Sequence, residues 1–142
     1  MLLDNEPYAL GLKPDWGLSI YVEGIGGPKL LMDVGGTYEK LSWNSRELGV
    51  ELAKLDAVFI SHWHGDHCGA LPELLESLGR EVQVFVPRMP SWPMKRELVE
   101  LGAELIEVRS PSELMPGIYS TGDLGGEHSL AIGVDGLGMV LV

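Results

Sequence analysis

The feature that most constrains the fold is a short apolar run followed at once by a loop rich in histidine. Residues 57–60 (AVFI) are all apolar, which is typical of a strand buried on both faces of a sheet. The loop after them, 61–69 (SHWHGDHCG), holds three of the four histidines of the chain and an aspartate. Leucines at 71, 74, 75 and 78 then follow helical spacing. The pattern predicts a buried strand, a functional loop and a helix, in that order.

Strands and helices alternate on the C-terminal side of this loop. We predict a helix at 71–78, a strand at 82–86, a helix at 93–101 and a strand at 104–108. This alternation indicates a parallel sheet with helices packed on it. The other elements that the pattern predicts are a helix at 42–48 and strands at 18–22, 30–34, 117–121, 129–134 and 138–142.

Length and composition limit the classes of function. A chain of 142 residues has room for one domain, 1–142. The single cysteine and the absence of a basic-then-apolar leader favour the cytoplasm, and no apolar window is long enough to span a membrane. The formal net charge of −11 disfavours nucleic acid, because a surface that binds phosphates needs clustered Lys and Arg. We therefore expect a small-molecule substrate and neither a nucleic-acid nor a membrane partner.

The residue types in the loop suit a metal ion. On an extended segment His62 and His64 project to the same side, and Gly65 lets the backbone turn so that Asp66 and His67 can face a second position. Imidazole and carboxylate suit Zn²⁺, and iron or manganese accept the same ligands. A bound metal would lower the pKa of a water molecule to about 7. The other interpretation, that these histidines only cap a helix, fits this spacing poorly.

The loop resembles the hallmark of the metallo-β-lactamase superfamily, His-x-His-x-Asp-His. Residues 31–35 (LMDVG) look like the strand of that family that ends in Asp-x-Gly. More narrowly, residues 16–19 and 127–130 resemble the branch that contains the dihydropterin–ribofuranosylaminobenzene phosphate synthases. The residues that match the hallmark are His62, His64, Asp66 and His67.

This resemblance implies an α/β fold that corresponds to the N-terminal half of an αββα sandwich, with a mixed sheet and flanking helices. It implies that His62 and His64 hold one zinc ion and that Asp66 and His67 hold a second. Asp66 would also orient or deprotonate the attacking water. Asp33 would hydrogen-bond the loop without binding metal.

The chain also departs from the family pattern. Family members complete each metal with ligands from the second half of the sandwich, so the domain at 1–142 looks incomplete and a second copy would have to complete it. We interpret His128 as a structural residue or a support for a ligand. We expect Cys68 to be small and buried, the alternative being a thiolate ligand. Trp63 either walls the substrate entrance or packs in the core, and 87–93 is apolar enough to line a pocket.

Two functions follow from these observations. The first is a metal-dependent hydrolase, active as a homodimer, that cleaves an ester, amide or phosphoester of a small molecule. The second is an inactive half-domain that binds metal weakly or serves as an oligomerising module, because two ligands per ion fall short of the three that catalytic zinc usually has. A nuclease of the same superfamily is disfavoured by the negative charge.

Overall fold

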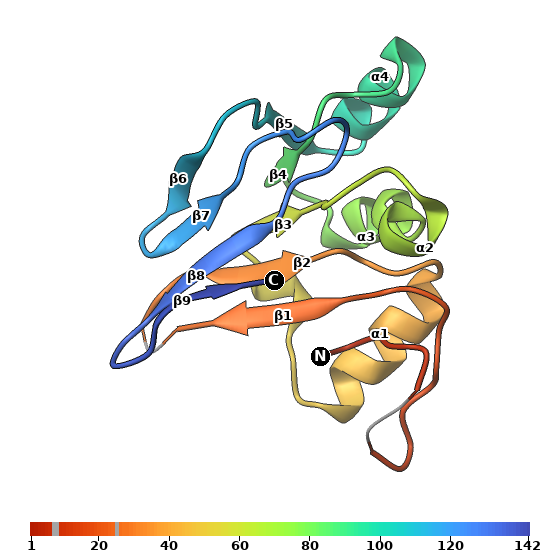
Figure 1. The fold of residues 1–142 in the computed structure, drawn as a ribbon. Coiled ribbons are helices and arrows are strands. Elements are labelled where there is room, and N and C mark those ends of the chain that lie inside the picture. The colour runs from red at the N-terminus through yellow and green to blue at the C-terminus, as the bar shows by residue number, and fades with distance from the viewer. Residues whose placement is uncertain (7–8, 25) are drawn as a thin grey trace.

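The structure, a computed structural model, describes residues 1–6, 9–24 and 26–142. Its first sheet has five strands in the order in which they occur in the chain (Figure 1). The first two strands pair antiparallel and the others pair parallel, so the sheet is mixed. The strands are β1 (Ile20–Glu23), β2 (Lys29–Met32), β3 (Ala57–Phe59), β4 (Val82–Val86) and β5 (Ala103–Glu107).

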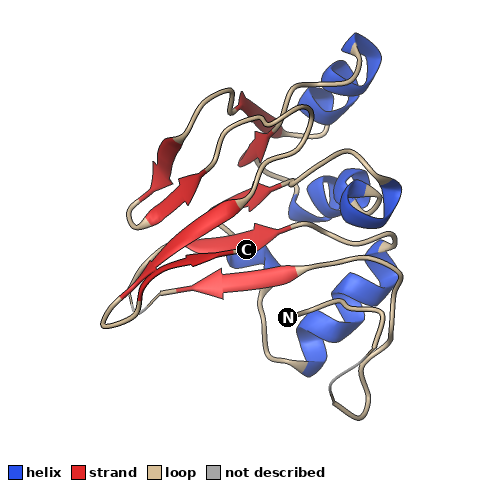
Figure 2. Ribbon diagram, in the orientation of Figure 1, coloured by secondary structure: helices blue, strands red, loops and turns tan. Residues whose placement is uncertain are grey.

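Helices cover one face of this sheet (Figure 2). The leucines at 71, 74 and 75 are fully buried, as the helical spacing predicts. They share one apolar core with Val58 and Val84 of the sheet and with Ile60, which follows β3. The helices are α1 (Tyr38–Glu47), the short 3₁₀ helix η1 (Leu52–Lys54), α2 (Gly65–Cys68), α3 (Leu71–Leu78) and α4 (Trp92–Glu100). Within the described residues, no helix is long and apolar enough to cross a membrane.

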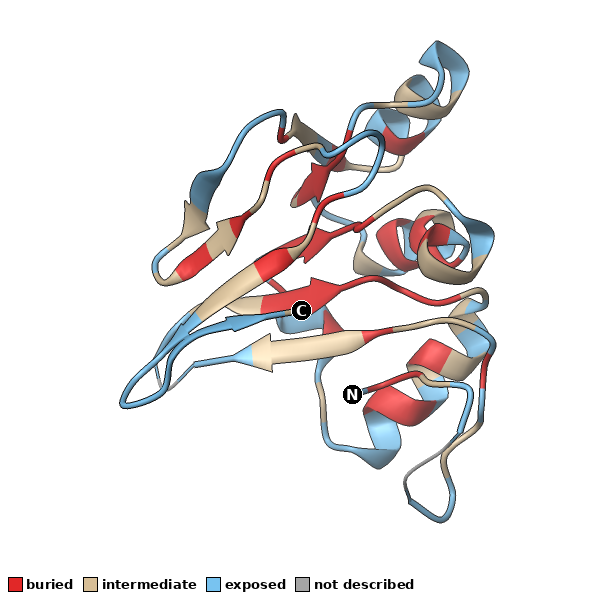
Figure 3. Ribbon diagram, viewed as in Figure 1, coloured by how far each residue is buried: buried red, intermediate tan, exposed pale blue. Residues whose placement is uncertain are grey.

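A second, antiparallel sheet lies against the other face of the first. Its strands, in order, are β6 (Ser112–Met115), β7 (Ile118–Ser120), β8 (Leu130–Val134) and β9 (Gly138–Leu141). A second apolar core, which includes Phe59, Phe85, Ile118 and Leu130, joins the two sheets. The result is a helix layer followed by two sheets, and β9 remains exposed along its length (Figure 3).

The predicted fold class is confirmed, with a mixed sheet and flanking helices. The predicted start of the helix at 42–48 is wrong, because α1 begins at Tyr38. Its buried face carries Asn44 and Ser45 beside Leu41, so apolar periodicity does not mark it. The strand predicted at 30–34 ends at Met32, because Asp33 adopts a left-handed backbone conformation with φ +53°. Strand β6 was not predicted, because Ser112–Met115 has two polar residues followed by two apolar ones and no alternation.

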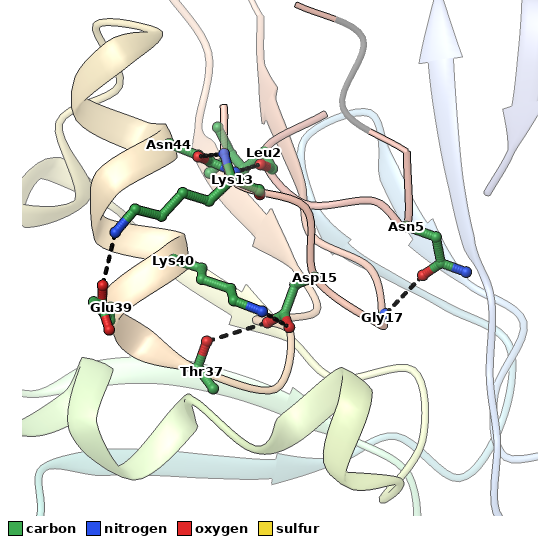
Figure 4. Close-up of polar contacts among 9 residues, drawn as sticks. All are labelled: Leu2, Asn5, Lys13, Asp15, Gly17, Thr37, Glu39, Lys40 and Asn44. Carbon is green, nitrogen blue, oxygen red and sulfur yellow. Dashed lines mark hydrogen bonds and ion pairs between the residues drawn. The ribbon is translucent and has the colours of Figure 1, made fainter. Parts of the chain in front are cut away.

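The N-terminal segment is held on α1 by hydrogen bonds (Figure 4). The Asn44 side chain accepts a bond from the Lys13 amide (2.8 Å) and donates to the Leu2 carbonyl (2.9 Å). Lys40 forms an ion pair with the buried Asp15 at 2.8 Å. These contacts anchor the segment that precedes β1 and lead it past the loop that follows β3.

Candidate metal centre

The candidate site lies where two neighbouring parallel strands end. Asp33 follows β2 and Ser61 follows β3, and the Asp33 amide donates to the carbonyl of Phe59 at 2.8 Å. The carboxyl ends of parallel strands meet at one edge of a sheet, which is where open α/β sheets bind ligands. The Val34 amide also donates to the His67 carbonyl (2.8 Å), which ties the histidine loop to the end of β2.

The carboxylate of Asp33 connects the residues of the site through hydrogen bonds. The side chain is fully buried (0% exposed) and accepts three hydrogen bonds at 2.7 Å. The Ser61 amide donates to Oδ1, and both the Ser61 hydroxyl and the His67 Nδ1–H donate to Oδ2. The predicted role of Asp33, a hydrogen-bond support for the loop, is confirmed.

This network sets the protonation of two imidazoles. Because a carboxylate only accepts, His67 must carry its proton on Nδ1. The Ser61 hydroxyl gives its single proton to Asp33, so at 2.9 Å it accepts from Nδ1 of His62. In the neutral imidazoles each Nε2 atom therefore keeps a free lone pair, the form in which histidine binds metal. The role of Ser61 was missed in the sequence, where the one available signal was its place directly before His62.

The four predicted ligands lie close to one another. The ring of His62 is 4.1 Å from that of His67 and 4.6 Å from that of His64, measured between centroids. The Nε2 atom of His67 is 3.8 Å from Oδ2 of Asp66, which is too long for a hydrogen bond. Asp66 and His67 are only partly buried, and His64 is exposed.

The donors fit zinc in chemistry and in protonation, but they do not form a complete ligand set. Among the described residues, no three His, Cys, Asp or Glu side chains are placed to hold one metal ion. Catalytic zinc usually has three protein ligands. Burial lowers the pKa of His62 below its ordinary value, which favours the neutral imidazole.

Close backbone contacts fix the loop. A Cβ atom on Gly69 would lie 2.3 Å from the Gly65 carbonyl oxygen, and one on Gly17 would lie 1.8 Å from the Asp66 carbonyl oxygen. Gly17 also has φ +131°, a region that other residues rarely adopt. Gly17 is required because the N-terminal segment passes directly over the backbone of Asp66, and Gly69 is required because its Cα lies against the backbone of Gly65 and Gly36.

His128 is a structural residue, as predicted. It is 3% exposed and its ring stacks on Phe59 with centroids 4.1 Å apart. Its Nε2 donates to the Ile60 carbonyl and its Nδ1 accepts from the Ser120 hydroxyl, both at 2.9 Å. Burial lowers the pKa of His128, and with both ring nitrogens hydrogen-bonded neither is free for a metal.

Cys68 is buried beside the loop, as expected. Burial in apolar surroundings raises the pKa of its thiol, so the thiolate that would bind a metal is disfavoured.

An open pocket of about 1020 Å³ adjoins the loop at Trp63, and we call it the Trp63 pocket. The indole Nε1–H of Trp63 donates to the Arg88 carbonyl at 3.1 Å, and Asp123 accepts from the Arg88 amide. Trp63 lines this pocket and also packs against the first apolar core, so the substrate entrance stays a prediction. Hydrogen bonds from the Gly126 and Arg88 amides lower the pKa of Asp123. The lining residues are Trp63, Arg88, Met89, Pro90, Arg109, Asp123, Gly125 and Gly126.

Comparisons with known proteins show what the chain is similar to. A sequence model of the metallo-beta-lactamase superfamily matches residues 14–140. The chain is 28% identical over 148 aligned residues to a 7,8-dihydropterin-6-methyl-4-(beta-D-ribofuranosyl)-aminobenzene-5'-phosphate synthase from Methanocaldococcus jannaschii. That match covers 88% of the chain and 50% of the relative, so the chain spans about half the length of this relative.

Solved structures show the same fold. An N-acyl homoserine lactone hydrolase superposes with a TM-score of 0.62 at 19% identity, over 85% of this chain and 60% of the other. The short form of human tRNase Z superposes with a TM-score of 0.61 at 13% identity, over 89% and 61%. At these identities the likeness concerns the fold and leaves the substrate open.

Proposed function

This chain belongs to the metallo-beta-lactamase superfamily, and on that premise we propose that it supplies the His62–His67 half of a metal-dependent hydrolase site. The single observation that carries the proposal is the Asp33 network, which leaves Nε2 of His62 and of His67 free to bind. The substrate class we propose is an ester, amide or phosphoester of a small molecule.

The residues of this chain have distinct parts in the proposal. His62 and His64 would hold one ion, and Asp66 and His67 a second. When bound, a divalent ion such as Zn²⁺ supplies Lewis-acid activation of water at neutral pH, and iron or manganese would serve the same ligands. Asp66, partly exposed beside His67, would orient the attacking water and accept its proton on Oδ2. Asp33 and Ser61 would hold the imidazoles in the binding tautomer.

The remaining ligands would come from a second chain, and we propose another copy of this one as their source. The exposed strand β9 offers Met139, Val140 and Leu141 as an apolar surface against which a copy can pack. The lone cysteine, which is buried, supports the proposal of a reducing cytoplasm for this protein.

The first test is metal content. The chain is dialysed against micromolar Zn²⁺ and its zinc is measured by elemental analysis, beside His62→Ala, His64→Ala and the exposed control Asp135→Ala. We expect bound zinc in the chain and the control, and loss in both histidine variants. Equal zinc in all four proteins would refute the proposed site.

The second test concerns assembly and turnover. Sedimentation velocity is measured with and without zinc, and hydrolysis of chromogenic esters, amides and phosphoesters is screened on the zinc-loaded chain. A zinc-dependent dimer that turns over one of these substrates, with activity lost in Asp66→Asn, is the expected result. No retained zinc and no turnover would favour the alternative, an inactive half-domain, in line with the incomplete ligand set.

A further inference from the structure

We propose that the Trp63 pocket binds an anionic group of the substrate, a phosphate or carboxylate on a small molecule, through Arg88 and Arg109. The proposal rests on the proposed function, because it assigns a substrate class to the same site. It adds a binding residue set that lies outside the histidine loop.

The pocket adjoins the histidine loop at one residue, Trp63. Trp63 lines it and stands between His62 and His64 in the chain. On the opposite wall, Gly125 and Gly126 precede Glu127, which pairs with His62 in an isolated antiparallel bridge. The pocket and the candidate metal centre therefore share one segment of backbone, at His62 and Trp63.

The pocket is lined by positively charged side chains, of which this chain has few. Only 10 residues of the chain are Lys or Arg, and two of them line this pocket. Arg88 is exposed, and within the described residues its guanidinium has no hydrogen-bond or ion-pair partner. The Arg109 side chain is 79% exposed and contacts Glu107 at 3.4 Å, while Lys95 holds the same Glu107 at 3.0 Å. Both guanidinium groups are thus available to a ligand.

Among the described residues that line the pocket, Asp123 is the one carboxylate, and its oxygens already accept hydrogen bonds. Oδ1 of Asp123 accepts the amides of Gly125 (2.9 Å) and Gly126 (2.6 Å), and Oδ2 accepts the amide of Arg88 (3.1 Å). Asp123 therefore shapes the two walls of the pocket and holds them together. Two arginines against one aspartate leave the lining with a net positive charge.

The chemistry favours a small anion. Guanidinium forks bind phosphate and carboxylate through two parallel hydrogen bonds, and the apolar surface of Met89 and Pro90 suits an attached carbon skeleton. A nucleic acid would bring many further phosphates against a protein of net charge −11. One charged group on a compact molecule avoids that repulsion.

Binding can be measured without metal or turnover. The chain is freed of metal with a chelator and titrated with inorganic phosphate, phenyl phosphate and benzoate, while ¹⁵N–¹H spectra follow the indole N–H of Trp63, assigned with Trp63→Phe. We expect saturable binding that moves this signal. Each of Arg88→Ala and Arg109→Ala should weaken binding about tenfold, as loss of a charge-assisted hydrogen bond implies. Arg88→Lys keeps the charge but lacks the two parallel N–H donors of a guanidinium, so it should weaken binding less than Arg88→Ala does.

The matched control is Arg96→Ala, because Arg96 is exposed on α4, pairs with Glu100 and does not line the pocket. An equal loss in this control would overturn the proposal, since general charge would then explain binding. So would the absence of saturable binding to all three probes, or tighter binding of a short oligoribonucleotide than of phenyl phosphate. Phosphate-only or benzoate-only binding would each support the proposal and identify the group. Because no metal is present, failure here would leave the hydrolase proposal to its own zinc test.

Discussion

Replacement of Asp33 is the sharpest test of how the site is built, because one buried carboxylate accepts all three of its hydrogen bonds from the loop. Asp33→Ala leaves the Ser61 amide, the Ser61 hydroxyl and His67 Nδ1 without an acceptor. At about 1.5 kcal/mol for each bond to a charged group, the free energy of unfolding should fall by about 4 to 5 kcal/mol. With an unfolding entropy of about 2.1 cal/mol/K per residue, the Tm of 142 residues should fall by about 15 °C.

Asp33→Asn tests the protonation of the imidazoles rather than the fold. The Ser61 amide can only donate, so the new amide oxygen must stay opposite it and the new NH₂ must face the Ser61 hydroxyl and His67 Nδ1. His67 then accepts at Nδ1 and carries its proton on Nε2. The Ser61 hydroxyl, which now accepts from the new NH₂ group, donates to Nδ1 of His62, so His62 also carries its proton on Nε2. Zinc affinity should fall 10- to 100-fold, as is typical for supports of metal ligands.

The assays are urea unfolding for stability, imidazole ¹⁵N spectra for the tautomers and zinc titration for affinity. Ser61→Ala should change the tautomer of His62 alone, and Asp135→Ala, at an exposed position, should change nothing. A stability loss below about 1 kcal/mol in Asp33→Ala would refute the reasoning, since one ordinary hydrogen bond contributes that much. An unprotonated Nε2 of His67 in Asp33→Asn would refute it equally.

Three further predictions follow from the described contacts. Gly17→Ala should lower the free energy of unfolding, measured with urea, by about 2 to 4 kcal/mol, because the new Cβ would meet the Asp66 carbonyl at a disfavoured φ. Gly49→Ala, with open space around it, should lower the same quantity by about 1 kcal/mol. Equal losses in the two variants would contradict this prediction. Cys68 should resist iodoacetamide at pH 8 until urea unfolds the chain, because burial raises its pKa; rapid labelling of the folded chain would count against it. Burial lowers the pKa of His128 in the folded state, so below about pH 6.5 the unfolded state binds more protons than the folded state. The free energy of unfolding should therefore be full above that pH and decline as the pH falls. His128→Gln should flatten this decline between about pH 7.5 and 5.5, and an unchanged slope would argue against the reasoning.

Much of the site could be predicted from the sequence, because its residues are neighbours in the chain or end neighbouring strands. The apolar run before the loop and the leucine spacing after it placed β3 and α3 correctly, and Asp33 was assigned its support role. Ser61 was not, because a serine has no pattern of its own and acts here through two side chains that only the fold brings to it.

The Trp63 pocket was beyond sequence reasoning for a similar reason. Arg88 and Arg109 follow different strands, β4 and β5, and Asp123 comes from a loop beyond β7, so no spacing along the chain relates them. The apolar character of 87–93 predicted a pocket wall. The charged groups that line the same pocket are brought together only by the tertiary structure.

The position of His128 has a consequence for how the two sheets can move. Its amide donates to the Ser61 carbonyl (3.0 Å) and its ring donates to the Ile60 carbonyl, so the second sheet is fastened to the residues that lead into the histidine loop. Opening of the sandwich at this edge would break both of these hydrogen bonds. The packing of the second sheet and the position of the histidine loop are therefore coupled, so a change that loosens the sheets is expected to disturb the loop as well.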